Sequence, residues 1–232
     1  MKLFGKPRDE LRAEPGPLVS AYLSTGVSAL DAALGGGFKR GSVTLVQAEG
    51  AATGGDFRKL TSSATRTMLS EGSGALVVPT LDETPRQVYD ALLAGEERVM
   101  PPDRLRIIDY FSERLGEPWL LPLAPTVGRS QALRRMVDAE KHLSGKPRRP
   151  FLELMALDTN EKAWATGGAA QAFAHGVERS RQIGNTTLVW IREDSSMLSA
   201  ARSIADFQLI LSRDLNGTSI RGVKPTFPPI VL

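Results

Sequence analysis

The chain of 232 residues contains no cysteine and only two histidines, His142 and His175. The lack of cysteine excludes disulfide scaffolds, thiolate metal sites and cysteine nucleophiles, and so few histidines exclude a histidine-rich metal centre. No apolar run approaches the roughly 20 residues of a membrane-spanning helix. The charged first residues also lack the apolar centre of a secretory signal. These absences predict a cytoplasmic protein with no membrane contact.

An excess of charge of one sign is also lacking, because 29 basic residues face 26 acidic residues and give a net charge of +3. So small a charge does not by itself indicate binding to nucleic acid. With 41% hydrophobic and 24% charged residues, the composition is that of an ordinary globular protein, long enough to bury a core. We expect a flexible leader over residues 1–17 and a single domain over residues 18–232.

Apolar, β-branched runs alternate with segments of helical character along this domain. The runs predict buried strands, and the segments between them, several of which end at glycine, predict helices. The strands are expected at 42–48, 75–81, 105–109, 151–157 and 186–191, and the helices at 27–34, 56–70, 131–143, 169–183 and from Pro85 onward, with Thr84 as the N-cap. Residues 112–128 are expected to be irregular, and residues 159–168 to form a loop.

The order of these elements predicts an α/β fold with three layers, in which a mostly parallel central sheet is flanked by helices. At the C-terminal end, Asn216-Gly217 lies between apolar runs at 204–212 and 218–223. This dipeptide is typical of a tight turn between antiparallel strands. The fold is therefore expected to end in an antiparallel hairpin.

A glycine-rich turn, Gly50-Ala51-Ala52-Thr53-Gly54-Gly55, lies between the first of these strands and the helix that follows. Strand, glycine-rich turn and helix form the arrangement in which backbone N–H groups and the helix dipole bind a phosphate. The turn keeps the glycine spacing of the P-loop, G-x-x-x-x-G-K-[ST], but Asp56 stands at the lysine position and Phe57 at the serine or threonine position. Those two positions normally neutralise the β- and γ-phosphates and bind magnesium.

Aspartate at the lysine position replaces an attraction for phosphate with a repulsion. Two unit charges about 4 Å apart interact by roughly 4 kcal/mol at an effective dielectric constant of about 20. We therefore expect MgATP binding to be severely weakened and no cofactor to be used. Lys59 is a candidate substitute cation, because helical side chains lean toward the N-terminus, and Arg58 is a candidate partner for Asp56. The double change Asp56→Lys with Phe57→Thr is expected to recover nucleotide binding if the loop keeps its backbone.

A distinctive segment precedes the first strand: Ser24-Thr25-Gly26-Val27-Ser28-Ala29-Leu30-Asp31, followed by Leu34-Gly35-Gly36-Gly37-Phe38. In the form S-T-G-x-x-x-L-D-x-x-L-G-G-G, it resembles the KaiC branch of the RecA superfamily. Weaker likenesses downstream extend the resemblance over residues 20–225. The resemblance implies a RecA-like core that assembles into rings or filaments.

Four further positions match functional residues of that family. Asp82 and Glu83 resemble the family's L-E-E-S-P segment, whose first acid helps to activate water in family ATPases. Asp158 follows a run that resembles the Walker B strand, which implies a carboxylate on the magnesium side. Lys224 resembles the lysine that reaches the nucleotide of a neighbouring subunit.

Three catalytic parts of the family are altered. Asp56 and Phe57 break the Walker A motif, and Asp82 is shorter than the usual glutamate. The family's K-M-R-G becomes Lys224-Pro225-Thr226, so that the arginine is missing. The resemblance therefore implies a protein that has kept the fold and lost the ATPase, as the accessory RecA-like subunits of Elongator have.

Each candidate site residue also has a purely structural interpretation. Gly54 and Gly55 can form a tight turn without an anion, and Asp82 and Glu83 can cap the helix that begins at Pro85. Asp158 can cap the turn after its strand. Trp164 is a candidate for stacking on single-stranded nucleic acid or an ordinary loop residue. A basic cluster is either a contact for an acidic partner or phosphate backbone, or a solvated helix face; it comprises Arg134, Arg135, Lys141, Lys146, Arg148 and Arg149.

Two functions from different classes follow from these observations. The first is a regulatory or assembly module that associates with itself or with an active RecA/KaiC-like paralogue, with Lys224 facing an acid such as Asp56 across the subunit boundary. The second is an ATP-binding RecA-family ATPase with an unorthodox P-loop that uses ATP and magnesium and acts on nucleic acid. The pair Asp56-Phe57 favours the first.

Overall fold

The computed structural model of the chain describes residues 20–93, 102–111, 117–123, 129–145, 149–164, 166–215 and 217–232. The expected leader over residues 1–17 lies outside these ranges. Asn216 of the hairpin turn and two members of the basic cluster, Lys146 and Arg148, lie outside them as well.

Nine strands form the central sheet: β3 (Val43–Gly50), β4 (Ala75–Val78), β5 (Leu105–Asp109), β6 (Leu120–Pro122), β7 (Leu152–Ala156), β8 (Thr186–Arg192), β9 (Phe207–Asp214), β10 (Gly217–Lys224) and β11 (Thr226–Val231). Their order in the sheet is β11-β10-β9-β3-β8-β7-β4-β5-β6. The neighbours from β9 to β6 are parallel, whereas β10 is antiparallel to both β9 and β11. The mostly parallel sheet and the antiparallel C-terminal hairpin are thus confirmed.

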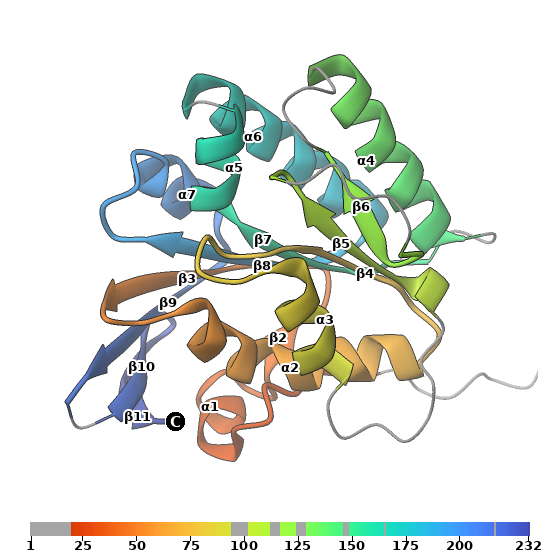
Figure 1. Cartoon of the computed structure of the whole chain (residues 1–232). Coiled ribbons are helices and arrows are strands. Elements are labelled where there is room, and N and C mark those ends of the chain that lie inside the picture. Colours follow the sequence, from red (N-terminus) through yellow and green to blue (C-terminus); the bar gives the residue numbers. More distant parts are fainter. Residues whose placement is uncertain are drawn as a thin grey trace, which may run out of the picture.

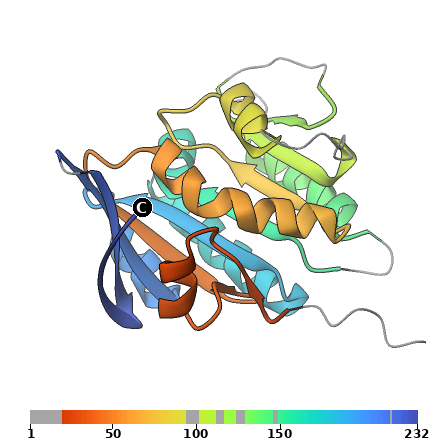
Figure 2. The same ribbon diagram turned by 90° about the horizontal axis from the view of Figure 1, so that it is seen from below.

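Helices cover both faces of this sheet, which confirms the three-layer α/β fold (Figure 1). One face carries α1 (Ser28–Ala33), α2 (Gly54–Ser70) and α3 (Pro85–Leu93), and the other carries α4 (Arg129–Ser144), α5 (Leu157–Trp164), α6 (Thr166–Ile183) and α7 (Leu198–Ile204). Figure 2 shows α2 lying along the sheet, with α1 beside the C-terminal strands. A short 3₁₀-helix (Pro102–Arg104) precedes β5, and β1 (Tyr22–Leu23) pairs with β2 (Phe38–Lys39) outside the main sheet.

The central strands are buried on both faces, as their continuous apolar runs predict. In β3, Val46 packs in the cluster that contains the apolar side of α2, whereas Leu45 packs in the cluster under α6 and α7. In β8, Trp190 packs in the first of these clusters and Val189 packs in the second. This alternation follows from the two-residue period of a strand. It fixes the carboxyl ends of β3 and β8 between two packed helical layers.

The segment that carries the family resemblance has a structural role in this fold. The Asp31 carboxylate accepts hydrogen bonds from the Thr25 N–H (2.8 Å), the Thr25 hydroxyl (2.7 Å) and the Ser24 hydroxyl (2.6 Å), so it holds the turn that leads into α1. Leu30 is fully buried. Gly37 is required because a Cβ there would collide with the Leu23 carbonyl oxygen, and its φ is 111°.

The expected loop over residues 159–168 is wrong, because α5 continues to Trp164 and α6 begins at Thr166. Asp158 therefore lies in the first turn of a helix rather than at the end of a strand. Leu157 and Asn160 are buried, and the Thr159 hydroxyl donates to the Pro79 carbonyl (2.7 Å). Short helices depend on such tertiary contacts more than on their own propensity, so the polar sequence of α5 gave only a weak signal.

Other elements differ from the expectation as well. The strand expected to begin at Ile204 begins at Phe207, because Ile204 ends α7. The short strand β6 lies within the stretch that was expected to be irregular. The strand β11 was not predicted, and it contains Pro228 and Pro229. Proline is tolerated there because β11 is an edge strand, where one side needs no hydrogen-bonded neighbour.

Candidate functional site

The chain leaves the neighbouring strands β3 and β8 in opposite directions. From β3 it crosses through α2 to β4, whereas from β8 it crosses through α7 to β9 on the other side of β3. In an open α/β sheet such a reversal leaves a crevice at the carboxyl ends of the strands, where ligands bind. A cavity of about 350 Å³ occupies this place, and it is lined by Gly50, Ala51, Ala52, Thr53, Leu81, Asp82, Asp158, Trp190 and Arg192.

Asp56, at the lysine position of the P-loop spacing, caps its own helix. The Thr53 hydroxyl accepts from the Asp56 N–H (3.3 Å), while Asp56 Oδ2 accepts from the Thr53 N–H (3.1 Å) and from the Thr53 hydroxyl (2.9 Å). This is a capping box, which satisfies backbone donors at the start of α2. The spacing T-x-x-D is visible in the sequence, but it lies inside the P-loop spacing, which favours the interpretation of a damaged phosphate site.

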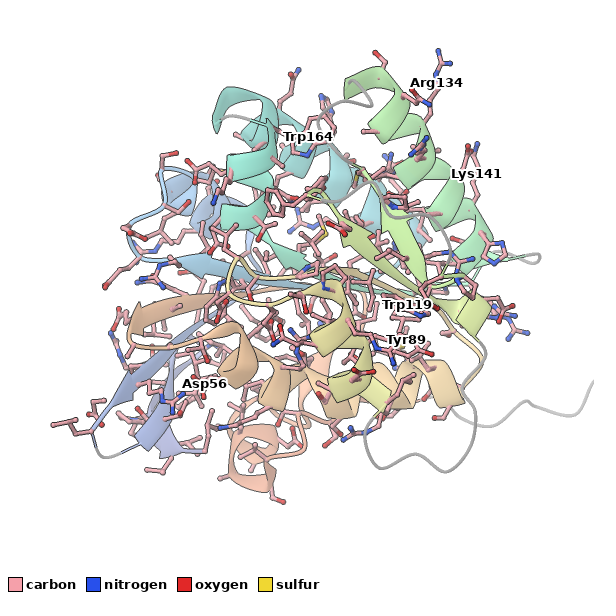
Figure 3. The ribbon with its side chains drawn as sticks, in the orientation of Figure 1. Asp56, Tyr89, Trp119, Arg134, Lys141 and Trp164 are labelled. Carbon is pink, nitrogen blue, oxygen red and sulfur yellow. The ribbon has the colours of Figure 1, made fainter. Side chains whose placement is uncertain are left out.

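The Asp56 carboxylate also joins α2 to the C-terminal hairpin (Figure 3). The Thr218 hydroxyl donates to Oδ1 (3.1 Å), the Arg213 guanidinium lies 3.3 Å from Oδ2, and the Lys59 ammonium lies 3.4 Å from Oδ1. Burial by itself would raise the pKa of Asp56, which is 1% exposed, but hydrogen bonds from Thr53, Thr218 and Lys59 outweigh it and hold the pKa below its ordinary value. Asp56 is therefore a charged, fully partnered structural residue.

A second carboxylate accepts a hydrogen bond from the first N–H group of α2. Asp82 Oδ2 accepts from the Gly54 N–H (2.9 Å). Gly54 is required by packing, because a Cβ there would collide with Thr80 Oγ1 and Glu83 Oε2. The expected alternatives for Asp82 were activation of water or a cap on the helix at Pro85. The structure shows a third role, since Asp82 caps α2 instead.

Glu83 forms an ion pair with Arg58, which is not the partner expected for either residue. Arg58 Nε lies 2.8 Å from Glu83 Oε1, its Nη2 contacts Oε2, and the Thr80 hydroxyl donates to Oε2 (2.8 Å). Both side chains of the pair are largely buried. The helix at Pro85 is capped by Thr84, whose hydroxyl accepts from the Gln87 N–H (3.2 Å), as the sequence predicts.

Phe57 lies in the hydrophobic core rather than at a magnesium site. It is 4% exposed, and its ring centroid lies 5.4 Å from that of Trp190 on β8. A Cβ at Gly55 would meet only Thr53 Oγ1, at 3.5 Å, and Gly50 has a φ of 61° at the end of β3. The glycines thus form a tight strand-to-helix turn, while Phe57 anchors the helix to the sheet.

Asp158 faces the crevice from the first turn of α5. Its Oδ1 is buried and has no hydrogen-bond partner among the described residues. Burial raises the pKa of Asp158 to about 6, against the opposing effects of hydrogen bonds that include one with Trp190 and of the charge of Arg192. The guanidinium of Arg192 lies 3.5 Å from Asp194. The crevice therefore presents two acids, Asp82 and Asp158, and one arginine.

The variant Asp158→Asn is expected to be more stable than the wild type near neutral pH, because it removes a charge whose burial is unfavourable. We expect a difference of about 2 kcal/mol, since residual exposure screens part of the cost of burying the charge. The folded-state pKa of about 6 lies above the ordinary 3.8, so the folded chain binds more protons between these values. Its free energy of unfolding therefore falls as the pH rises through that window. Urea unfolding across a pH series measures this difference, which should vanish under acid conditions. Wild-type and variant profiles that run parallel at every pH would contradict it.

Sequence reasoning missed the basic residues at this edge of the sheet. Arg192 ends β8 and Arg213 lies near the end of β9, and the carboxyl ends of parallel strands meet at one edge. The sequence signal that could have identified them is their position at the carboxyl ends of buried strands. Lys59, the candidate substitute cation, has a side chain that is 67% exposed and pairs with Asp56.

The remaining candidates lie elsewhere. Lys224 is exposed on β10, and its ammonium lies 3.3 Å from the Ala205 carbonyl oxygen of its own chain. Trp164 ends α5, half-buried, with its ring 5.9 Å from Tyr110 in an edge-to-face arrangement. On α4, Arg135 donates to the Pro122 carbonyl (3.0 Å) and Lys141 lies 3.5 Å from Asp138. Arg134 and Lys141 lie on the outer side of this helix (Figure 3).

Neither a metal centre nor a membrane-spanning helix is found in the described part of the chain. The described residues contain no group of three or more His, Cys, Asp or Glu side chains that could hold a metal ion. Among them, too, there is no helix with the length and apolarity needed to cross a membrane. No protein-family model matches the chain, and a search of curated proteins finds no matching sequence.

Proposed function

We propose that this chain is a KaiC/RecA-like protein that has lost ATPase activity and acts as a regulatory or assembly module in a homo- or hetero-oligomer. The observation that carries the proposal is the occupation of the start of α2 by the chain's own carboxylates. Asp82 accepts from the Gly54 N–H, and Asp56 accepts from the Thr53 N–H. Backbone donors at a helix N-terminus are what a phosphate would bind, and here internal acids use them.

The distribution of charge around α2 supports the same conclusion. Arg58 is paired with Glu83, and both Lys59 and Arg213 are paired with Asp56. A polyphosphate would have to displace these acids and approach Asp82 and Asp158 as well. Each close repulsion at about 4 Å costs roughly 4 kcal/mol at an effective dielectric constant of about 20. We infer that this crevice does not bind a nucleotide.

Exposed apolar side chains on the C-terminal strands support assembly through this part of the chain. Among the described residues, five large hydrophobic side chains are exposed, and three of them, Leu215, Val223 and Val231, lie on β10, β11 or the turn before β10. Large exposed apolar side chains are candidates for contacts with another protein chain. The pairing of Lys224 with Asp56 across a subunit boundary has no support, because Asp56 is buried and partnered within its own chain.

The alternative, an unorthodox ATPase that acts on nucleic acid, has less support. Trp164 packs against Tyr110 instead of projecting from a loop, and two of the described basic side chains on α4 have partners within the chain. The single arginine in the crevice, Arg192, faces two acids. We therefore retain the ATPase only as an outcome that the following experiment can reveal.

Multi-angle light scattering of the full chain, with and without MgATP, tests the proposal together with a phosphate-release assay on the same samples. We expect a molar mass above that of the 25.1 kDa chain, unchanged by MgATP, and no magnesium-dependent phosphate release. Leu215→Asp should reduce the mass, because it places a charge in an apolar contact. Phe111→Asp, which changes an exposed residue after β5, is the matched control and should not.

Each result of this experiment bears on the proposal. Phosphate release that Asp158→Ala abolishes would overturn it in favour of the ATPase. A monomer under every condition would exclude self-association and restrict the proposal to a hetero-oligomer with an active paralogue. A mass that Phe111→Asp lowers as much as Leu215→Asp would exclude the C-terminal strands as the assembly surface.

A further inference from the structure

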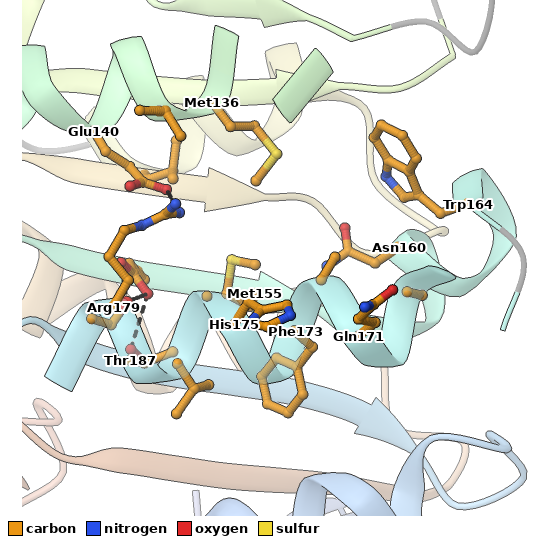
Figure 4. Close-up of a pocket in the computed structure, with 18 of the residues that line it drawn as sticks. Met136, Glu140, Met155, Asn160, Trp164, Gln171, Phe173, His175, Arg179 and Thr187 are labelled. Carbon is orange, nitrogen blue, oxygen red and sulfur yellow. Dashed lines mark hydrogen bonds and ion pairs between the residues drawn. The ribbon is translucent and has the colours of Figure 1, made fainter. Parts of the chain in front are cut away.

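A second cavity, separate from the crevice, lies on the opposite side of the sheet from α2. It has a volume of about 580 Å³ and opens between α4 and α6, over β7 and β4 (Figure 4). None of its lining residues belongs to the crevice at β3 and β8. Its walls are mainly apolar and include Leu76, Tyr110, Met136, Met155, Trp164 and Phe173. Size and lining are those of a small-molecule site, for which about 300–1000 Å³ is usual.

The acids of this cavity already have partners within the chain. Glu140 pairs with Arg179 at one end (Figure 4). Glu153 is buried and accepts hydrogen bonds from the hydroxyl of Ser180 (2.6 Å), the amide of Asn185 (2.8 Å) and the hydroxyl of Thr187 (3.0 Å). A charged ligand would lose its hydration on entering the cavity. It would gain no counter-charge in return, because these acids are already paired within the chain. The lining therefore favours an uncharged occupant.

One buried polar atom in the cavity lacks a partner. Asn160, on α5, is 7% exposed, and its Oδ1 makes no hydrogen bond among the described residues. The side chain extends into the space between α4 and α6, near Trp164 (Figure 4). A buried acceptor without a donor destabilises a fold, and native structures contain few of them. A ligand with an N–H or O–H group would satisfy this oxygen.

A glycine with open space beside it lies in the wall of the cavity. Gly176 lies inside α6, where glycine lowers helix stability. A Cβ at this position would meet no atom within 4 Å. Packing therefore does not require glycine here, whereas a larger side chain would extend into free space. The glycine lowers the stability of α6, and the unpartnered amide oxygen lowers the stability of the fold when the cavity is empty. A ligand would use the space beside the glycine and satisfy the oxygen.

We propose that the cavity between α4 and α6 binds an uncharged, mainly apolar small molecule that donates one hydrogen bond to Asn160 Oδ1. The apolar walls bury the body of the ligand, and Asn160 fixes its orientation. This site is independent of the proposed loss of ATPase activity, since it uses neither the start of α2 nor the C-terminal strands.

The probe N-phenyl-1-naphthylamine tests this proposal, because it is uncharged, carries one N–H group and fluoresces strongly in apolar sites. We expect saturable binding to the full chain. Gly176→Leu, which adds a bulky side chain at the wall of the cavity, should weaken this binding by about tenfold or more. Ala174→Leu changes an exposed position of the same helix and is the matched control. Binding that does not saturate, or that Gly176→Leu leaves unchanged in a folded protein, would overturn the proposal.

The hydrogen bond to Asn160 is tested with a second probe. 1-Phenylnaphthalene has a similar apolar body but no N–H group, so we expect it to bind the wild type about tenfold more weakly. Asn160→Leu should weaken the amine and leave the hydrocarbon unchanged. Equal affinity of the two probes for the wild type would remove the role of Asn160, and this comparison stands even if the variant fails to fold.

Discussion

Replacing Asp56 with lysine is expected to lower the free energy of unfolding by about 4 kcal/mol, as is typical when a buried ionic partner is lost. The change removes the capping box with Thr53 and leaves the Thr218 hydroxyl without its acceptor. It also places an ammonium beside Lys59 and Arg213, both of which face the Asp56 carboxylate in the wild type. Urea unfolding followed by circular dichroism gives the difference directly.

Two further variants separate the contributions to this loss. Asp56→Asn keeps the size of the side chain and removes only its charge, so its effect should lie between those of the wild type and Asp56→Lys. Lys59→Ala removes the most exposed partner and should cost no more than about 0.5 kcal/mol. A lysine variant as stable as the wild type would contradict the structural role of Asp56.

The variant Phe57→Thr is expected to lose about 3 kcal/mol, because deleting a buried aromatic ring removes its packing and leaves a cavity. Phe57 is 4% exposed and contacts Trp190, which lines the crevice. The matched control is Phe111→Thr, since Phe111 is 59% exposed and its loss should be within about 0.5 kcal/mol. Thermal and urea unfolding of both variants measure the effect. Equal losses at the two positions would show that Phe57 does not anchor α2.

These two expectations change what the sequence suggested about restoration of the P-loop. By its residue types, the double change Asp56→Lys with Phe57→Thr supplies the missing phosphate and magnesium ligands. In the structure, both replaced side chains hold α2 in place. We therefore expect the double variant to unfold rather than to recover nucleotide binding.

Much of the fold could be predicted from local sequence. Apolar, β-branched runs such as the one in β3 must be buried on both faces, so they predict a sheet between two helical layers. The strand over Leu105–Asp109 and the cap at Thr84 follow the prediction directly. Local patterns failed where packing decides the conformation, as in α5, whose polar turns are held by buried Leu157 and by the contact of Thr159 with Pro79.

The candidate site was less predictable, because its key contacts join distant parts of the chain. The sequence by itself determined that a lysine and a hydroxyl are missing from the glycine-rich turn, and this residue chemistry alone argues against MgATP. Only the tertiary structure decided what replaces them. Asp56 binds Thr218, 162 residues away, and Arg58 binds Glu83, 25 residues away. Such pairs depend on the order of strands in the sheet, which brings the hairpin and the loop after β4 to the start of α2, and no local pattern encodes that order.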